Sequence, residues 1–218
     1  MSFDIDIMFR YGPLLLSGLW TTVHVCALAS LLAVAAGLGV SVLYGLPMRP
    51  VKLLCRAYIE VMRGTPILTL LFILYYGGPS FGLTLDAELV GIIGLGLYGG
   101  GYFAEIFRAG FESIPAGQLE AARMLGIPRR LVVARIQIPQ MLTLIIPPST
   151  NQVIILVKES ALLSIITVAE LTKNTTQMVN ETFAVVEPYV AVALLYWLLI
   201  EGIALTGGAL ERRFGYAS

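Results

Sequence analysis

Long runs of apolar residues dominate the chain, and polar residues gather in the stretches between them. A helix needs about 20 apolar residues to cross a bilayer core about 30 Å thick, because in hydrocarbon every backbone N–H and C=O must be bonded within the segment. Five runs meet this length, at residues 19–43, 57–77, 89–109, 142–166 and 189–210. The pattern therefore predicts an all-α membrane protein with five transmembrane helices, forming one domain over residues 1–218.

The composition agrees with a chain that lies in lipid. Hydrophobic residues make up 57% and charged residues 13%, against about 25% charged residues in an ordinary soluble domain, and the mean hydropathy is +0.84. Asp4 and Asp6 precede the first run, where a signal peptide would carry basic residues, and the run is too long for a signal. We therefore expect the first span to be retained.

Net charge and cysteine content exclude several classes of protein. The chain has 14 basic and 14 acidic residues, and this balance argues against a nucleic acid as partner. Cys26 and Cys55 are the only cysteines, which leaves neither a disulfide framework nor a Cys-x-x-Cys metal site. Both are expected to be packing residues.

The distribution of basic residues predicts the orientation, because Lys and Arg near span ends stay on the cytoplasmic side. They gather after the first span, after the third span and at the C-terminus: Arg49, Lys52, Arg56, Arg123, Arg129, Arg130, Arg135, Arg212 and Arg213. Only Arg10 and Lys173 fall on the other side. The N-terminus is therefore expected outside and the C-terminus inside.

The longest connection, residues 110–141, is expected to face the cytoplasm and to contain a short helix. Ile114-Pro115 suits a helix start, and Gly126-Ile127-Pro128 supplies the glycine and the breaker that are typical of a helix end. The residues between them are good helix formers. The spacing predicts a helix over 116–125, lying across the membrane surface.

Residues in this connection resemble a known signature. Glu120-Ala121-Ala122, then Gly126 after three residues and Ile136-Gln137-Ile138-Pro139 after nine more, resemble the EAA loop of bacterial ABC importer permeases, here residues 112–139. Ile138 stands where Leu is usual. Residues 63–68, 102–110, 114–118 and 157–164 are similar to the branch of these permeases that handles polar amino acids and opines.

The resemblance implies a type I ABC importer permease fold in the bacterial cytoplasmic (inner) membrane. This chain would be one permease subunit, paired with a second permease subunit, two ABC ATPase subunits and an external solute-binding protein that delivers an amino acid. No Walker A pattern is present, so the resemblance implies that the partner ATPase binds ATP and Mg and that this chain is a transport subunit, not an enzyme, without a cofactor of its own.

The resemblance places ATPase coupling on the loop helix, at Gln118, Glu120, Ala121, Ala122, Leu125 and Gly126. A short rigid helix can transmit movement that a flexible loop would absorb. Ala121 and Ala122 permit close approach, and Gly126 permits a sharp exit from the helix. The alternative is an amphipathic loop helix that is merely solvated.

The fourth span carries the predicted substrate pathway, at Asn151, Gln152, Lys158, Glu159 and Ser160. Ionisable residues inside a membrane are costly and point to function. Pro147-Pro148 is expected to interrupt the span and create a helix N-terminus that attracts a carboxylate. Glu159 is a candidate for a ligand ammonium and Lys158 for a carboxylate. The alternative is that both form ion pairs between spans, with Glu105 as a partner.

Three other features have structural interpretations. Glu105 and Arg108 have the spacing of a local helix pair, and His24 is expected to be a packed, hydrogen-bonded histidine. The glycines of residues 94–99 fit G-x-G-x-x-G, but they lie within the third span, where they favour tight helix packing over a dinucleotide site.

A second function remains open on the residues alone. An ion-coupled secondary transporter or channel, acting without an ATPase, would use Glu159, Lys158 and Glu105 as an ion path. The lack of an obvious internal repeat disfavours this reading.

Overall fold

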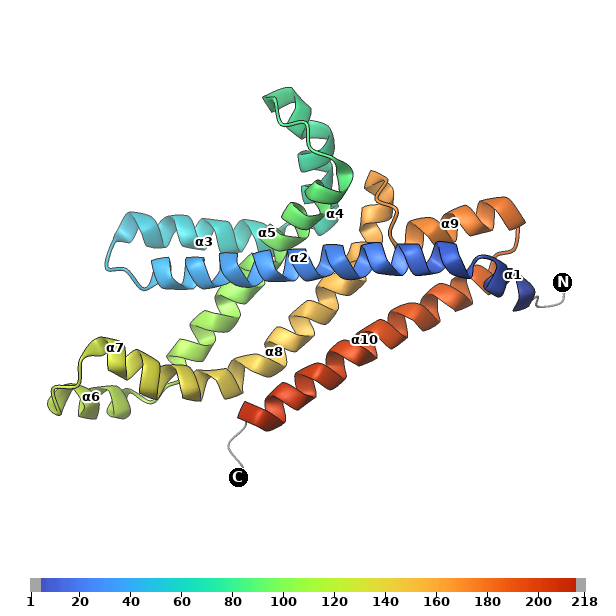
Figure 1. Ribbon diagram of the computed structural model, residues 1–218. Coiled ribbons are helices and arrows are strands. Elements are labelled where there is room, and N and C mark those ends of the chain that lie inside the picture. Colours follow the sequence, from blue (N-terminus) through green and yellow to red (C-terminus); the bar gives the residue numbers. More distant parts are fainter. Residues whose placement is uncertain (1–4, 215–218) are drawn as a thin grey trace.

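The computed structural model describes residues 5–214, which form helices joined by short connections and contain no strand (Figure 1). The α-helices in chain order are α1 (Ile5–Arg10), α2 (Gly12–Tyr44), α3 (Arg49–Gly64), α4 (Ile67–Phe72), α5 (Ala87–Glu112), α6 (Ala116–Met124), α7 (Arg129–Val132), α8 (Ile138–Glu159), α9 (Leu171–Thr182) and α10 (Val186–Phe214). Wider π turns at Ile73–Gly77 and Val133–Gln137 and 3₁₀ turns at Gly78–Phe81 and Ser160–Ile166 complete them.

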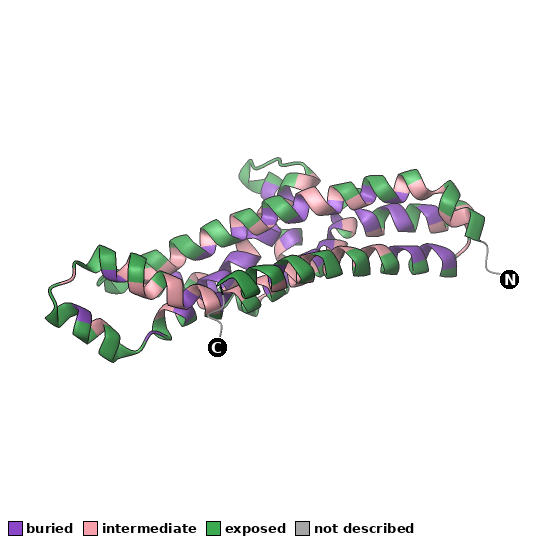
Figure 2. Cartoon of the chain, turned by 60° about the horizontal axis from the view of Figure 1, so that its bottom comes forward, coloured by how far each residue is buried: buried purple, intermediate pink, exposed green. Residues whose placement is uncertain are grey.

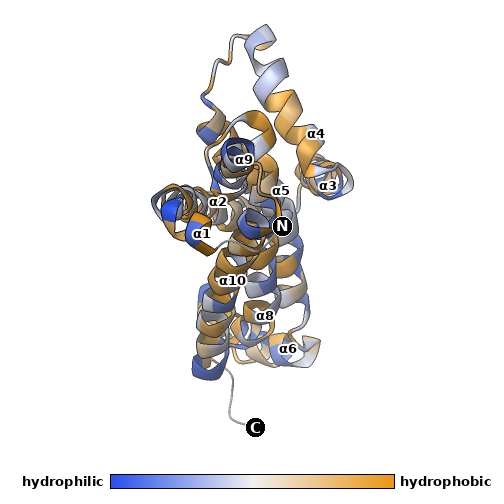
Figure 3. Cartoon of the chain, turned by 90° about the vertical axis from the view of Figure 1, so that its right-hand side faces the viewer, coloured by the Kyte–Doolittle hydropathy of each residue, from blue (hydrophilic) through white to orange (hydrophobic). Residues whose placement is uncertain are grey.

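Four of the five predicted spans correspond to long helices. α2, α5, the continuous segment Arg129–Ile166 and α10 are each long and apolar enough to cross a membrane. α2 is 33 residues long, longer than the predicted span, because its apolar residues continue on both sides of residues 19–43. Exposed apolar side chains run along α2 and α10, as expected for surfaces in contact with lipid (Figure 3).

The second predicted span has a different shape from the expected straight helix over 57–77. α3 ends at Gly64, and the chain turns by 106° before the helical segment Ile67–Phe81. Pro66 causes the break, because proline has no N–H to donate and forces the preceding residue out of the helical region; Thr65 has φ −104° and ψ 133°. The number of spans is four, or five if this bent pair is one span.

α5 lies at the centre of the bundle and packs most closely on α2. Glycines make the approach possible. A Cβ atom on Gly37 of α2 would lie 2.5 Å from the Cβ of Phe103, and one on Gly96 of α5 would lie 2.5 Å from Leu32 Cδ2. The small residues let the two backbones come together and bury the α5 side chains (Figure 2). The packing interpretation of the third-span glycines is therefore confirmed.

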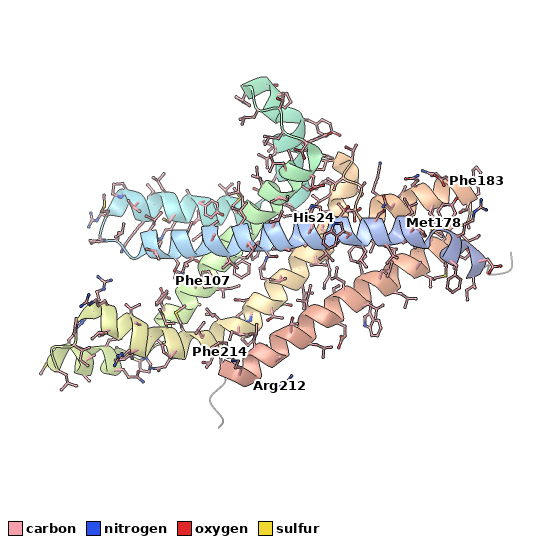
Figure 4. All side chains as sticks on the ribbon, in the orientation of Figure 1. His24, Phe107, Met178, Phe183, Arg212 and Phe214 are labelled. Carbon is pink, nitrogen blue, oxygen red and sulfur yellow. The ribbon has the colours of Figure 1, made fainter. Side chains whose placement is uncertain are left out.

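Polar contacts join other helices to the first half of α2. His24 Nε2 lies 2.6 Å from Glu88 Oε1 of α5 (Figure 4), which confirms a packed, hydrogen-bonded histidine. The Thr22 hydroxyl accepts the Leu171 N–H at 3.1 Å, and Asn174 Nδ2 donates to Leu14 O at 2.9 Å. These bonds fix α9 across the start of α2.

The α2–α5 approach predicts opposite effects of alanine at two glycines of α2. Gly37→Ala should destabilise the fold by about 1–3 kcal/mol, because the new methyl group meets backbone and Cβ atoms of α5. Gly39→Ala, two residues further and without any atom within 4 Å, should be neutral or stabilising by up to about 1 kcal/mol through helix propensity. The temperature of aggregation in detergent measures both; equal effects would contradict the packing.

Candidate functional site: helix α6 and the face of α8

α6 confirms the predicted loop helix, with bounds Ala116–Met124. Pro115 precedes its first residue and has an extended ψ of 129°. At the other end, Ile127 N–H donates to Ala122 O and Gly126 N–H donates to Arg123 O, both at 3.0 Å. Gly126 has φ +68°. This is the Schellman arrangement, which satisfies the last carbonyls and ends the helix at a defined residue.

The predicted coupling residues on α6 divide into one buried and five exposed positions. Ala122 is 3% exposed and packs on the connection, whereas Gln118, Glu120, Ala121, Leu125 and Gly126 are exposed. Gln118 Oε1 accepts a hydrogen bond from Gln140 Nε2 at 2.7 Å, which ties α6 to the start of α8. Met124 and Leu125, 90% and 77% exposed, form an apolar tip with nothing packed on it.

Residues 129–166 connect this tip to the membrane as one helical segment, α7 to Ile166. α8 continues through Pro147 and Pro148 without a break. The expected helix N-terminus at these prolines, and the carboxylate site built on it, are therefore wrong. The two missing N–H groups do not divide the helix, because backbone bonds persist on both sides and Thr150 Oγ1 donates to Ile146 O at 3.1 Å.

The five predicted pathway residues lie on different faces of α8. Gln152 and Ser160 are buried, Glu159 is half-buried, and Asn151 and Lys158 are exposed. The structure thus separates Asn151 and Lys158 from Gln152 and Glu159, as the 3.6-residue period requires.

The buried face contains the polar groups nearest to the core. Gln152 Nε2 is buried and has no hydrogen-bond partner among residues 5–214. Glu159 lies within electrostatic reach of Tyr98 on α5. Ser160 Oγ donates to Val157 O at 2.7 Å, so its hydroxyl satisfies its own helix. The Gln152 amide nitrogen and the Glu159 carboxylate are the polar groups of this face that make no hydrogen bond within residues 5–214.

The charges of α5 are paired locally. Arg108 Nη2 lies 2.8 Å from Glu105 Oε2 and its Nη1 lies 2.6 Å from Glu112 Oε2, which confirms the predicted helix pair. Arg63 of α3 adds a longer contact with Glu105 at 3.7 Å. The charge of Glu105 is therefore already balanced by arginines. The suggested ion pair between Glu105 and Lys158 is wrong, because Lys158 forms no ion pair within residues 5–214.

Glu170 is a polar residue whose role the sequence reasoning missed. Its carboxylate is fully buried and accepts the Thr172 and Lys173 N–H groups at 2.8 and 2.7 Å and the Tyr196 hydroxyl at 2.9 Å. Burial raises the pKa of the Glu170 carboxyl, and these donors oppose the shift. The sequence signal for this role is the position of Glu170 directly before α9, where a carboxylate can cap the helix. The contact with Tyr196 could not be predicted, because Tyr196 lies on another helix, α10.

Comparison with known proteins identifies the family to which this fold belongs. The family described as "Binding-protein-dependent transport system inner membrane component" matches residues 30–216. The chain belongs to this family. The permease is 32% identical to "Probable glutamine ABC transporter permease protein GlnM" of Bacillus subtilis, over 96% of its own length and 97% of that protein. It is 30% identical to "Arginine transport system permease protein ArtQ" of the same organism, over 98% of its own length and 98% of that protein.

A third relative and two solved structures agree with this assignment. "Octopine transport system permease protein OccM" of Rhizobium radiobacter is 31% identical over 91% of the permease and 85% of that protein. A solved amino acid ABC transporter with histidines matches 98% of the permease and 100% of that chain at a TM-score of 0.91 and 35% identity. The MetNI methionine transporter shares the fold at 22% identity and a TM-score of 0.80, covering 95% and 99%.

These comparisons establish the general class of the protein. The chain is an ABC importer permease, a transport component without catalytic activity of its own, with several apolar helices and a type I permease fold.

Neighbouring alanines of α6 test its packing. Ala122→Leu should destabilise the loop by about 1–3 kcal/mol, because the larger side chain has to enter a filled site. Ala121→Leu, on the exposed side of the same turn, should change stability by less than about 0.5 kcal/mol. Hydrogen exchange of residues 116–127 measures the difference. Equal protection in both variants would show that Ala122 is not a packing position.

Proposed function

We propose that the chain is the permease subunit of an ATP-driven importer of polar amino acids or related zwitterions in the bacterial cytoplasmic membrane, with its N-terminus outside and its C-terminus inside. The observation that carries the proposal is α6: a helix with defined ends, exposed apart from the buried Ala122 and the half-buried Leu119, that carries the EAA residues and leads into an apolar tip. Such a helix is suited to fit a groove on another protein.

The partner in this proposal is an ABC ATPase that binds ATP and Mg. Closure of the two ATPase subunits moves α6, and the continuous segment Arg129–Ile166 carries the movement to the membrane helices. Packed helices have few alternative arrangements, so the movement shifts the passage between inward-open and outward-open states. ATP drives this shift only through its different affinities for the two states.

An external solute-binding protein delivers the ligand in this proposal, and a second permease subunit completes the pathway. The relatives are named for glutamine, arginine and octopine, ligands that share a protonated amino nitrogen and a carboxylate. Gln152, with its unpaired amide, and the half-buried Glu159 supply the hydrogen-bonding and anionic groups for such a ligand. Asn151, Lys158 and Ser160 flank them on α8.

The alternative ion-coupled transporter or channel is weakened by one contact. That mechanism needs Glu105 as a titrating station, but Arg108 and Arg63 hold its carboxylate. A carboxylate paired with two arginines is a poor proton carrier, because its charged form is stabilised.

The apolar tip of α6 provides a test of ATPase docking. Met124→Asp should lower the amount of ATPase that co-purifies with the permease by about tenfold, equivalent to ~1.4 kcal/mol of binding free energy. Phe183→Asp is the matched control, since Phe183 is 85% exposed and has φ +55°, which Asp tolerates. Loss of ATPase in the control, or retention in Met124→Asp, would contradict docking through α6.

Glu159 provides a test of the ligand site. Glu159→Gln keeps the size of the side chain and removes its charge, so it should weaken the stimulation of ATP hydrolysis by a loaded binding protein about tenfold for a cationic amino acid and much less for a neutral one. ATPase assays of the reconstituted complex with each ligand measure the ratio. Equal stimulation would remove Glu159 from the site, while leaving the importer assignment intact.

A further inference from the structure

Three basic residues in the first half of α3 have no acidic partner within the described residues 5–214. Arg49, Lys52 and Arg56 follow one another at intervals of three and four residues, so they lie along one stripe of the helix. None of them forms an ion pair in that range. Glu60 is the one acidic residue of α3, and it forms no ion pair with Arg56. The stripe therefore carries positive charge that the described part of the chain leaves unbalanced.

Tyr44, the last residue of α2, holds two of these cations in place. Arg56 Nε donates to the Tyr44 hydroxyl oxygen at 3.0 Å. Lys52 Nζ and the guanidinium carbon of Arg56 each lie 5.8 Å from the centre of the Tyr44 ring, within the range of a cation–π contact. Side chains that are already ordered lose less conformational freedom when a ligand binds. The basic stripe is therefore prepared for an anion.

The three basic residues and Leu53 line a cleft of about 340 Å³. Its walls are mainly apolar, because Leu53 and the aliphatic stems of the basic side chains form them, while charged ends extend toward the rim. The apolar surface continues beside the cleft, since Leu54 and the preceding Leu46 and Met48 are also exposed. A small soluble anion gains nothing from apolar walls. A molecule with an anionic head and an apolar body uses both parts of the site.

The cleft lies at the level where the headgroups of a bilayer are expected. α2 has 33 residues and is about 50 Å long, more than the hydrocarbon core of about 30 Å. Tyr44 at its end has the apolar ring and polar tip that favour the membrane–water boundary. The turn between α2 and α3 lies at the end of the molecule that carries α6 (Figure 1). In the proposed orientation this end faces the cytoplasm.

We propose that this cleft binds an anionic phospholipid of the cytoplasmic leaflet, with its phosphate among Arg49, Lys52 and Arg56 and the start of its acyl chains against Leu53. Guanidinium and ammonium groups form strong, charge-assisted hydrogen bonds with phosphate oxygens. Basic pockets beside membrane helices on the cytoplasmic side suit such headgroups. Several cations without a nearby carboxylate favour a lipid with net negative charge over phosphatidylcholine, whose choline balances its phosphate. The leaflet rests on the orientation given with the proposed function.

Retention of lipid by the complex of permease and ATPase tests the charge of the site. The complex is incubated in mild detergent with equal amounts of phosphatidylglycerol and phosphatidylcholine and washed on a column, and the retained lipids are measured by mass spectrometry. Arg49→Gln with Lys52→Gln should lower retained phosphatidylglycerol about tenfold, and it leaves the bond between Arg56 and Tyr44 intact. The charge-conserving pair Arg49→Lys with Lys52→Arg should retain it to within about twofold.

A matched control separates the cleft from general attraction to positive charge. Arg212→Gln with Arg213→Gln also removes two exposed cations, from the last turn of α10. This variant should retain phosphatidylglycerol to within about twofold of the unmodified complex. An equal loss in both double variants would show that overall charge, and not the cleft on α3, holds the lipid.

A second comparison distinguishes a phospholipid from a free phosphate ion. Leu53→Gln keeps the basic residues and makes the wall polar, so it should lower retained phosphatidylglycerol about threefold. Leu210→Gln, at another exposed leucine, is the control and should have no such effect. Washing with inorganic phosphate should leave the phosphatidylglycerol bound. Release by inorganic phosphate, together with full retention in Leu53→Gln, would identify a site for a soluble anion instead.

The outcomes separate this inference from the proposed function. Equal retention of the two lipids by the unmodified complex, or undiminished retention of phosphatidylglycerol in Arg49→Gln with Lys52→Gln, would overturn the lipid site while ATP-dependent uptake persists. Absence of both the ATPase and uptake in the unmodified complex would instead overturn the proposed function.

Discussion

The close approach of α2 and α5 is the contact on which the rest of the structure depends. In lipid the hydrophobic effect does not drive helices together, so they associate through van der Waals contact and hydrogen bonds, which require small residues at the interface. Gly37 and Gly96 remove the side chains that would keep the backbones apart. With α5 fixed against α2, the helices α3 and α8 find stable positions on its other sides.

This packed centre also supports the coupling role that we propose for α6. α5 leads directly into α6 through Ser113 to Pro115, and the segment Arg129–Ile166 returns to the membrane without a flexible gap. The Schellman end at Gly126 and the Gln118–Gln140 bond hold α6 between these two arms. In the proposed coupling, a force applied to α6 reaches α5 and α8 through the short connections 113–115 and 125–128.

The sequence predicts the parts of the fold that depend on local pattern. Four spans follow from apolar length, and α6 follows from Pro115 and Gly126, which act on their own backbone. α3 begins at Arg49, eight residues before the predicted span, because its apolar residues occupy one face and give no continuous run. Proline is a helix breaker in the sequence at both Pro66 and Pro147-Pro148, but the outcomes differ. Pro66 follows the end of the amphipathic helix α3, whereas Pro147 and Pro148 lie inside the long helix α8, which keeps its other backbone hydrogen bonds.

The candidate site was harder to predict, because its polar groups are defined by tertiary neighbours. Sequence spacing identified the Glu105–Arg108 pair. It did not show that this pair, together with Arg63, leaves Glu105 unable to act with Lys158 or Glu159. The buried carboxylate of Glu170 depends on Tyr196, 26 residues away. Charges that find partners within the chain stiffen it, at Glu105 and at Glu170. Within residues 5–214, Lys158, Glu159 and Glu201 make no ion pair or hydrogen bond, so local spacing alone could not show which charges of the membrane helices are balanced and which are not.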